Sequence, residues 1–275
     1  ALAGILPELD QEESLEVTSI HSVAGLLRES IITSAPFRSP HHTASYVSIV
    51  GGGTTPKPGE VTLAHRGILF MDEFPEFDKR VLESLRQPLE DRVVHVSRAK
   101  GTAMFPANFI LVAAMNPCPC GNYGVRNKRC SCTAGDIARY KRKLSGPIMD
   151  RIDLWLEVGN IDYEKLSEKA SGEESSLVRE RVIRARDIQR ERFLQNKNKS
   201  KTNSDIGIRS IEKLIPLADP VRKLLNESAR KLDISPRAYH KTIKVARTIA
   251  DLEKSNEVTS PHILEALRYR PKEII

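Results

Sequence analysis

Two adjacent carboxylates that follow a short apolar run are the best candidates for chemistry in this chain. Residues 68–71 are Ile-Leu-Phe-Met, preceded by Gly67 and followed by Asp72 and Glu73. Four large apolar residues in a row predict a strand that is buried on both faces. At the end of that strand, Asp72 could hold Mg²⁺ and Glu73 could polarise a water molecule that attacks a phosphate. The alternative is an ordinary buried strand that runs into an acidic turn.

A second apolar run could bring a side-chain amide to the same place. Residues 109–115 are Phe-Ile-Leu-Val-Ala-Ala-Met and lead to Asn116, which predicts a second buried parallel strand. Ligands of doubly wound sheets bind beyond the carboxyl ends of the strands. We therefore expect Asp72, Glu73 and Asn116 at one edge of the sheet. There, Asn116 could orient a water molecule against a phosphate, or it could only cap the turn before Pro117.

Two other stretches suggest binding sites at first sight, and their details argue against both. The stretch 51–59 is rich in glycine and proline, but a P-loop needs its lysine directly after the last glycine and at a helix start. Prolines flank Lys57 and oppose a helix there, so we interpret the stretch as a turn-rich loop. His41 and His42 suggest a metal, but adjacent side chains point apart, which favours a polar, hydrogen-bonded turn.

All cysteines of the chain lie in one short segment. They form two C-x-C pairs and are Cys118, Cys120, Cys130 and Cys132. Four thiolates could bind one structural Zn²⁺, although the spacing is tighter than in the usual C-x₂-C pair. Reduced structural thiols and a redox pair are the alternatives. Their confinement to one segment argues for a local site and against a disulfide scaffold.

Basic residues in two places could bind a polyanion. Residues 93–97 and 102–105 predict two short strands joined by a turn, in which Arg98 and Lys100 could grip nucleic-acid phosphates or could simply be solvated. A second group lies in the predicted helix 136–143 and consists of Arg139, Lys141, Arg142 and Lys143. The formal net charge of +7 is compatible with DNA as a partner.

Two arginines could contact a nucleotide phosphate. Arg151 lies between a predicted short helix and a predicted strand, from which it could enter the site of a neighbouring subunit. Alternatively, it forms a surface ion pair with Asp150 or Asp153, which would contribute little stability. Arg237 falls in the first turn of the helix that begins at Ser235. A cation there opposes the helix dipole, so we expect a compensating anion such as a phosphate.

Length and composition indicate an ordinary globular protein. The 275 residues are 40% hydrophobic and 29% charged, and the length suits one large or two modest domains. No apolar stretch is long enough to span a membrane, and no secretory signal is visible. We therefore expect a cytoplasmic protein without membrane contacts. A domain boundary is predicted near Gly159, between domains over 1–158 and 159–275.

Helical patterns dominate the second half of the chain. Residues 177–195 predict a long charged helix, and the polar residues 196–203 predict an exposed loop. Three later helices are predicted to begin at Ser-Pro or Asp-Pro pairs, with Asp219, Ser235 and Ser260 as N-caps. In the first half, residues 78–87 predict an amphipathic helix that stops before Pro88.

The motifs together resemble one family. GILFMDE, AAMNPCPCG, LSGPIMDRIDL and SPRAYHKTIKVARTIADL look like the magnesium-chelatase-like AAA+ ATPases, specifically the ComM/YifB competence-protein branch. PFRSPHH and LRQPLEDRVVHVSRA resemble the same branch, so the resemblance covers essentially the whole chain. It implies an α/β fold in which a truncated AAA+ core, a parallel sheet with helices on both faces, is followed by an all-α lid.

The resemblance also implies roles, cofactors and partners. Its expected site residues are Asp72 and Glu73 as Walker B, with Mg²⁺ on Asp72, Asn116 as sensor 1, Arg151 as the arginine finger and Arg237 as sensor 2. The cofactors would be ATP and Mg²⁺, and the protein would form hexameric rings with DNA branch-migration and helicase activity. Residues 45–59 would be the helix-2 insert and 98–101 the tip of the pre-sensor-1 hairpin.

The resemblance further implies segments that would precede Ala1. They are the first strand with its P-loop and an N-terminal Lon-protease-like domain. We therefore interpret the chain as a fragment that neither binds ATP tightly nor hydrolyses it alone.

Two other functions compete with the DNA motor. The first is the motor subunit of a metal chelatase, but such subunits resemble NPEEG where this chain has NPCPCG. That difference disfavours metal insertion into a tetrapyrrole. The second is a zinc-stapled DNA-binding module without ATPase activity, which would bind DNA independently of nucleotide.

Overall fold

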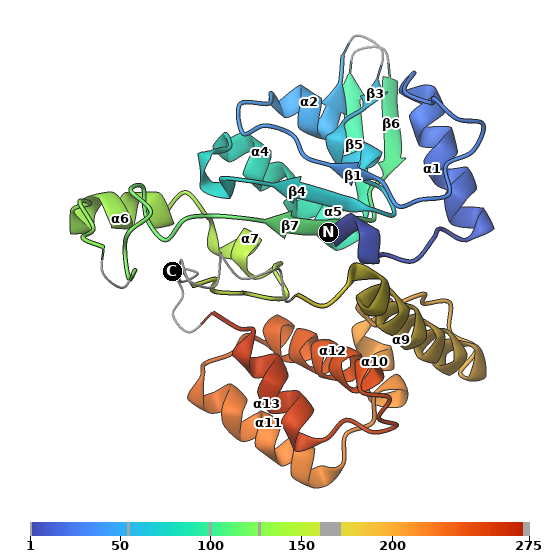
Figure 1. Cartoon of the computed structure of the whole chain (residues 1–275), viewed down its shortest axis with the longest axis vertical. Helices are drawn as coiled ribbons and strands as arrows, with labels where there is room; N and C mark the ends of the chain where they lie inside the picture. The colour runs from blue at the N-terminus through green and yellow to red at the C-terminus, as the bar shows by residue number, and fades with distance from the viewer. Residues whose placement is uncertain (1, 54–55, 99–100, 126–127, 160–171, 272–275) are drawn as a thin grey trace. The chain divides into compact units, whose positions relative to one another are not determined.

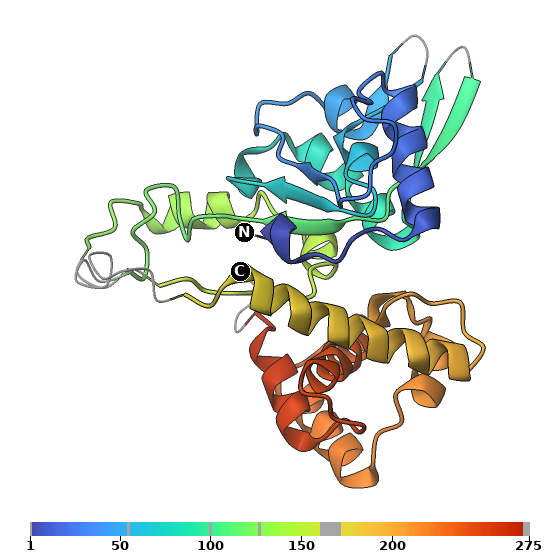
Figure 2. The same cartoon turned by 45° about the vertical axis from the view of Figure 1, so that its right-hand side comes forward.

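The protein consists of two compact units, described here by a computed structural model. The structure describes residues 2–53, 56–98, 101–125, 128–159 and 172–271. The units are Ala1–Arg151 and Ile152–Ile275. The first contains a small parallel sheet with helices, and the second is built from helices (Figures 1 and 2). The predicted order of an α/β core followed by an all-α region is therefore confirmed.

The first unit alternates short strands with short helices. Its elements are η1 (Leu2–Ile5), α1 (Gln11–Val23), β1 (Phe37–Arg38), α2 (Tyr46–Val50), β2 (Gly51–Gly52), β3 (Lys57–Pro58), α3 (Glu60–Leu63), β4 (Ile68–Met71), η2 (Phe74–Glu76), α4 (Lys79–Ser84), α5 (Arg86–Asp91), β5 (Val93–Arg98), β6 (Gly101–Pro106), β7 (Ile110–Ala113), α6 (Ala134–Lys141) and α7 (Gly146–Met149). One hydrophobic core joins residues from α2, α3, β4, α4, β5 and α7.

Strand β4 is the centre of the sheet, which has the order β1-β4-β7 with parallel pairing throughout. Ile68, Leu69 and Met71 are buried, as the apolar run predicts. β7 pairs with β4 along its whole length, from Ile68↔Ile110 to Met71↔Ala113. It is nevertheless an edge strand of the described sheet, and its Ile110 is 45% exposed. The prediction that this second run is fully buried is wrong, because only one side of β7 carries a neighbouring strand.

Close backbone packing sets the beginning of β4. The Ile68 N–H donates to the Pro36 carbonyl at 2.8 Å. A Cβ atom on Gly67 would lie only 1.9 Å from that same carbonyl oxygen, so no larger residue fits. Glycine at this position therefore allows the segment before β1 to pack against the start of β4.

A buried histidine connects α1 with the start of β7. His65 is 4% exposed; its Nδ1 accepts from the Asn108 N–H at 3.0 Å, and its Nε2 lies 3.1 Å from Glu16 Oε2. Burial lowers the pKa of His65, and hydrogen bonding to Glu16 opposes that effect only in part. The ring is therefore neutral near pH 7, with the proton on Nε2, and it satisfies a backbone group next to β7.

The β5–β6 hairpin forms as the two strand-like runs predict. The strands pair antiparallel from Val93↔Pro106 to Arg98↔Gly101. Residues 99–100 of the predicted turn lie outside the described residues.

Three local predictions differ from the structure. Stretch 51–59 contributes β2 and β3, which pair antiparallel, instead of a plain loop. The helix predicted over 78–87 stops before Pro88 but ends earlier than expected, because α4 ends at Ser84. A second helix, α5, begins at Arg86 and contains Pro88 in its first turn, where a missing N–H costs no hydrogen bond. No strand forms over 152–159, which the structure describes as irregular.

The second unit is a helical bundle with its own core. Its helices are α9 (Ser175–Gln195), α10 (Ile208–Leu214), α11 (Asp219–Lys231), α12 (Pro236–Leu252) and α13 (Ser260–Arg268), with the short η3 (Asn203–Asp205). Apolar residues from each of these described helices meet in one cluster. The long charged helix is confirmed as α9. Ser235 caps α12 as predicted, by accepting from the Ala238 N–H at 3.2 Å. The other two caps lie one residue earlier than predicted, at Ala218 and Thr259.

A buried polar network holds the end of the 196–203 segment. Its composition predicts an exposed loop, but Asn203 is only 2% exposed. The Asn203 amide donates to Asp251 Oδ2 at 2.8 Å and to Thr248 Oγ1 at 3.0 Å. Asp251 also accepts from Arg192 and Arg247. The loop prediction is wrong here because residues distant in sequence satisfy the polar side chain inside the bundle.

No helix in the described part of the chain combines the length and the apolar character needed to cross a bilayer.

Replacing Asp251 with alanine tests the buried network. The side chain of Asp251 is 0% exposed, and its removal leaves two guanidinium groups without their anion. We expect a loss of about 3–5 kcal/mol in the free energy of unfolding, measured with urea and circular dichroism. The exposed pair Arg190–Asp187 is the control, because Asp187→Ala should cost no more than about 1 kcal/mol. Equal costs for the two variants would show that the network does not stabilise the bundle.

Candidate functional site

Backbone hydrogen bonds continue beyond the ends of β4 and β7 and bring the residues that follow together. The Ala114 N–H donates to the Met71 carbonyl at 3.0 Å, and the Phe74 N–H donates to the Ala114 carbonyl at 2.9 Å. Asp72 and Glu73 lie between these two bonds, and Asn116 follows two residues after Ala114. The acid pair and the amide therefore belong to the same edge of the sheet, which we call the acid rim (Asp72, Glu73 and Asn116).

The two carboxylates of the acid rim are exposed at the end of a buried strand. Asp72 Oδ1 accepts from the Glu73 N–H at 2.9 Å. Glu73 has left-handed backbone angles, with φ 50° and ψ 43°, which is costly for a residue with a side chain and is concentrated at functional sites. Mg²⁺ prefers oxygen ligands and takes few of them from the protein, so an exposed Asp72 carboxylate at this strand end fits that ion.

Glu73 has a partner that the sequence did not indicate. His42 Nδ1 lies 2.8 Å from Glu73 Oε2. A carboxylate can only accept, so the proton of this bond belongs to His42. The ring of His42 also lies against His41, with centroids 4.2 Å apart, and edge-on to Phe77.

The position of His42 follows from strand β1. Because β1 runs parallel to β4, the chain beyond it reaches the same carboxyl edge. The two-residue strand is too short to be recognised by periodicity, and this is why the contact was missed. The expected polar turn is present as well, since His41 Nδ1 and Thr43 Oγ1 are 2.8 Å apart. An open depression of about 530 Å³ adjoins His42 and includes Ser45, Glu76 and Arg80 in its lining.

Tyr140 of α6 packs against the backbone of Asn116. Its side chain is largely buried, and the backbone of Asn116 lies close enough to the phenol to influence its pKa. Burial raises the pKa of Tyr140, and the charges of Glu76 and Glu73 add to this effect. Asn116 itself is exposed, so its side-chain amide stays accessible while Tyr140 packs against its backbone.

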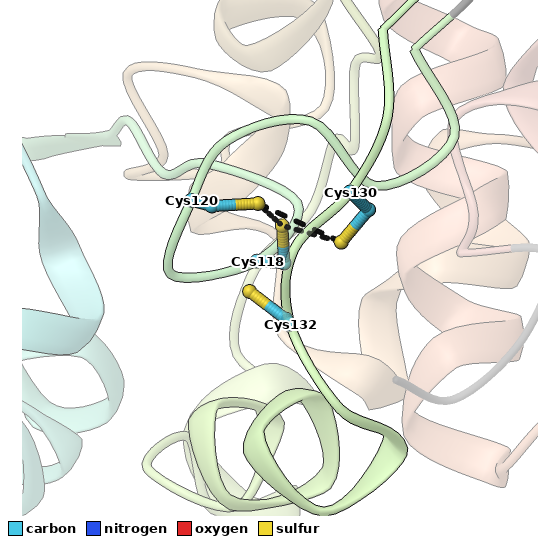
Figure 3. Close-up of side chains that lie close together, drawn as sticks. All are labelled: Cys118, Cys120, Cys130 and Cys132. Atoms are coloured by element: carbon cyan, nitrogen blue, oxygen red, sulfur yellow. Dashed lines mark hydrogen bonds between the residues drawn. The ribbon is translucent and has the colours of Figure 1, made fainter.

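The four cysteines form one compact group directly after Asn116 (Figure 3). Their sulfur atoms all lie within 4.8 Å of one another. Cys118 Sγ is 3.4 Å from Cys120 Sγ and 3.8 Å from Cys130 Sγ, and the last two are 3.6 Å apart. All four are free thiols. The structure thus brings together every cysteine that the sequence singled out, in an arrangement that could hold a metal ion.

Arg151 is held within its own unit. Its side chain is 12% exposed and forms an ion pair with Glu90 of α5. It also donates to the backbone carbonyls of Pro147, at 2.7 Å, and Arg86, at 3.1 Å. The sequence had offered Asp150 or Asp153 as a surface partner, and the ion pair that the structure describes is with Glu90.

The predicted DNA-binding residues lie in two separate places. The β5–β6 hairpin and α6 are at opposite ends of the first unit in both views (Figures 1 and 2). Lys143 is paired with Glu76 at 2.7 Å, Lys141 lies 5.9 Å from the centroid of the Tyr123 ring, and Arg139 has a side chain that is 76% exposed. Arg142 is exposed. Only the backbone of Arg98 is described, and Lys100 lies outside the described residues.

Arg237 belongs to the second unit, in the first turn of α12. One turn later, Lys241 Nζ lies 2.8 Å from Asp153 Oδ1. Burial lowers the pKa of Lys241, and the positive charges of Arg237 and Arg270 contribute in the same direction. Positive charge is therefore concentrated at this end of α12, where Asp153 pairs with Lys241.

The comparison with known proteins places this architecture in a family. The model described as "Magnesium chelatase, subunit ChlI" matches residues 1–166, and "Magnesium chelatase, subunit ChlI C-terminal" matches 172–270. The chain is similar to "Competence protein ComM" of Haemophilus influenzae, with 45% identity over 98% of this chain and 52% of the relative. It is also similar to "Uncharacterized protein YifB" of Salmonella typhimurium, with 43% identity over 98% of this chain and 52% of the relative.

A more distant similarity was found as well. The chain is 27% identical to "DNA replication licensing factor Mcm6" of Drosophila melanogaster, over 79% of this chain and 26% of the relative. The chain spans about half the length of the bacterial relatives named above. The matches over both units show that this chain belongs to the magnesium-chelatase-like AAA+ family, in its ComM/YifB branch.

Proposed function

We propose that this chain supplies the acid rim and the helical lid of an ATP-driven motor that acts on DNA. The observation that carries the proposal is the parallel pairing of β4 with β7, which delivers two exposed acids and an amide to one edge. The motor would assemble as a hexameric ring in the cytoplasm and drive branch migration or helicase activity in competence and recombination. The similarity to ComM and, more distantly, to Mcm6 supports this choice.

Each residue of the acid rim would have a separate role in ATP hydrolysis. When bound, ATP with Mg²⁺ supplies the phosphoryl group and the charge neutralisation for its transfer. Asp72 would hold the ion, Glu73 would accept a hydrogen bond from the attacking water, and Asn116 would orient that water. Arg237 would contact a phosphate from the lid, and Arg151 would act on the site of a neighbouring subunit after exchanging its partner Glu90.

The exposed edge of β7 is consistent with this proposal. Among the described strands, β7 pairs only with β4, and Ile110 is 45% exposed. An edge strand with exposed apolar residues offers a pairing site for another strand. In a protein of the relatives' full length, we propose that a strand carrying the phosphate-binding loop pairs there and completes the nucleotide site.

Replacing Glu73 with glutamine tests the acid rim. In a protein of the relatives' full length, Glu73→Gln should reduce DNA-stimulated ATP hydrolysis by about 100-fold or more, because the group that polarises water is lost. ATP binding should persist, as measured by fluorescence with a nucleotide analogue. Glu76→Gln makes the same chemical change three residues later and should retain most of the activity. Unchanged turnover in Glu73→Gln would refute the assignment.

Replacing His42 with alanine tests the contact with Glu73. A half-exposed pair of this kind contributes about 0.2–1 kcal/mol, so kcat should change by at most about fivefold while KM stays nearly constant. His41→Ala removes the neighbouring ring, which has no bond to Glu73, and serves as the matched control. Equal effects of the two variants would mean that the ring pair is only structural.

Removing two charges from the hairpin tip tests its contact with DNA. The double variant Arg98→Ala with Lys100→Ala should weaken DNA binding and reduce the slope of log K against log salt by about 2. The control removes the same charge from α11 through Lys223→Ala with Arg230→Ala and should leave the slope unchanged. A hairpin variant with normal affinity at low salt would contradict the proposal.

A further inference from the structure

We propose that one structural Zn²⁺ is bound by Cys118, Cys120, Cys130 and Cys132. We further propose that this ion holds the backbone that follows Asn116 in place. We call these four residues the thiolate site. Metal binding rests on the cysteines alone, whereas the importance of Asn116 rests on the proposed function.

The spacing of the sulfur atoms fits a single tetrahedral ion. Four thiolates at about 2.3 Å from a central zinc are about 3.8 Å from one another. The observed separations of 3.4, 3.6 and 3.8 Å among Cys118, Cys120 and Cys130 lie close to that value. Cys132 completes the set within the 4.8 Å that encloses all four sulfurs (Figure 3).

A backbone N–H group next to the sulfurs can orient one ligand of the site. The Tyr123 N–H donates to Cys118 Sγ at 3.3 Å. A donor of this kind stabilises negative charge on sulfur and fixes the orientation of a metal ligand.

The other uses of four cysteines fit less well. In a disulfide, the sulfurs are about 2.05 Å apart, and a redox pair would engage only two of the four thiols. Tetrahedral sulfur ligands suit either zinc or iron. A cluster with several irons would spread its ligands around a larger core, whereas these sulfurs converge on one point. A mononuclear site with zinc is therefore the assignment that uses all four residues.

The position of the thiolate site in the chain indicates what the ion would do. Asn116 lies two residues before Cys118, and Thr133 follows Cys132 directly and caps α6. The other end of α6 carries Tyr140, which contacts the backbone of Asn116. A Cβ atom on Gly121, which has φ +77°, would lie 3.9 Å from Asn116 Cγ.

The ion would thus join the two ends of the 118–132 segment. Closing that loop lowers the conformational entropy of the chain before Asn116 is ordered. Because the segment begins next to Asn116 and leads into α6, the ion would hold the amide at the acid rim through both connections.

Elemental analysis of the full chain is the first test. The protein is purified without chelator and without a metal-affinity step, and it should contain about one zinc ion per chain and no comparable amount of iron. Replacement of zinc by Co²⁺ should produce the visible absorption of tetrahedral cobalt with thiolate ligands. Zinc well below one ion per chain without a cobalt spectrum would overturn the site. Iron with acid-labile sulfide would replace it by an iron–sulfur cluster and would also overturn it.

Variants then separate metal binding from a general loss of structure. Cys130→Ser with Cys132→Ser should lose the zinc, while Ser131→Ala, which changes the residue between them, should keep it. Should the double variant fail to fold, the zinc content and cobalt spectrum of the unmodified chain still decide the question.

Hydrogen exchange tests the proposed role of the ion. Chelation of zinc should accelerate amide exchange in α6 and around Asn116 and leave α12 in the helical unit unchanged. Zinc that binds without protecting α6 would disprove the positioning role while leaving the metal site intact. None of these outcomes bears on whether Glu73→Gln loses ATP hydrolysis. The zinc site and the proposed ATPase function can therefore fail separately.

Discussion

The parallel pairing of β4 with β7 is the interaction on which the rest of the first unit depends. Its register runs without interruption from Ile68↔Ile110 to Met71↔Ala113 and continues in the backbone bonds of Ala114. A shift by one residue would force the apolar side chains of β4 to repack on opposite faces and would move Asp72 and Glu73 relative to Asn116. Burial of these apolar side chains therefore sets the position of Asp72, Glu73 and Asn116.

The acid rim also depends on neighbours that compensate charge without covering the site. His42 donates to Glu73, and Lys143 pairs with Glu76. These pairs are exposed or half-exposed, so each contributes little to stability. Their effect is orientation, together with the left-handed backbone at Glu73. By contrast, Asp251 in the helical unit is fully buried, and its charge pairs matter because solvent does not reach a buried carboxylate to compensate its charge.

Local chemistry explains which elements could be predicted from the sequence. The apolar run of β4 and the long pattern of α9 have clear periodicity or composition, and both formed. Ser235 caps α12 because its hydroxyl can satisfy a nearby N–H. The N-caps of α11 and α13 lie at Ala218 and Thr259, one residue before the predicted Asp219 and Ser260. The prediction chose Asp219 and Ser260 because each directly precedes a proline and has a side chain typical of an N-cap. Thr259 instead forms a capping box with His262.

Long-range packing explains the predictions that were wrong. The polar segment that ends at Asn203 has the composition of an exposed loop, and only the bundle provides the partners that bury it. Ile110 is half-exposed because β7 is an edge strand of the described sheet. Neither composition nor periodicity records which strand lies at an edge, because that depends on which other strands are present.

The sequence by itself determined the chemical groups and their order: an acid pair after one strand, an amide after the next, and four thiols directly behind the amide. The tertiary structure alone decided which distant groups meet them, as in the contacts of His42 with Glu73, Tyr140 with Asn116, and Arg151 with Glu90. The physical reason is that strand type and turn chemistry are local properties of the chain. Contacts between residues far apart in sequence exist only after apolar burial has set the sheet register and placed the helices.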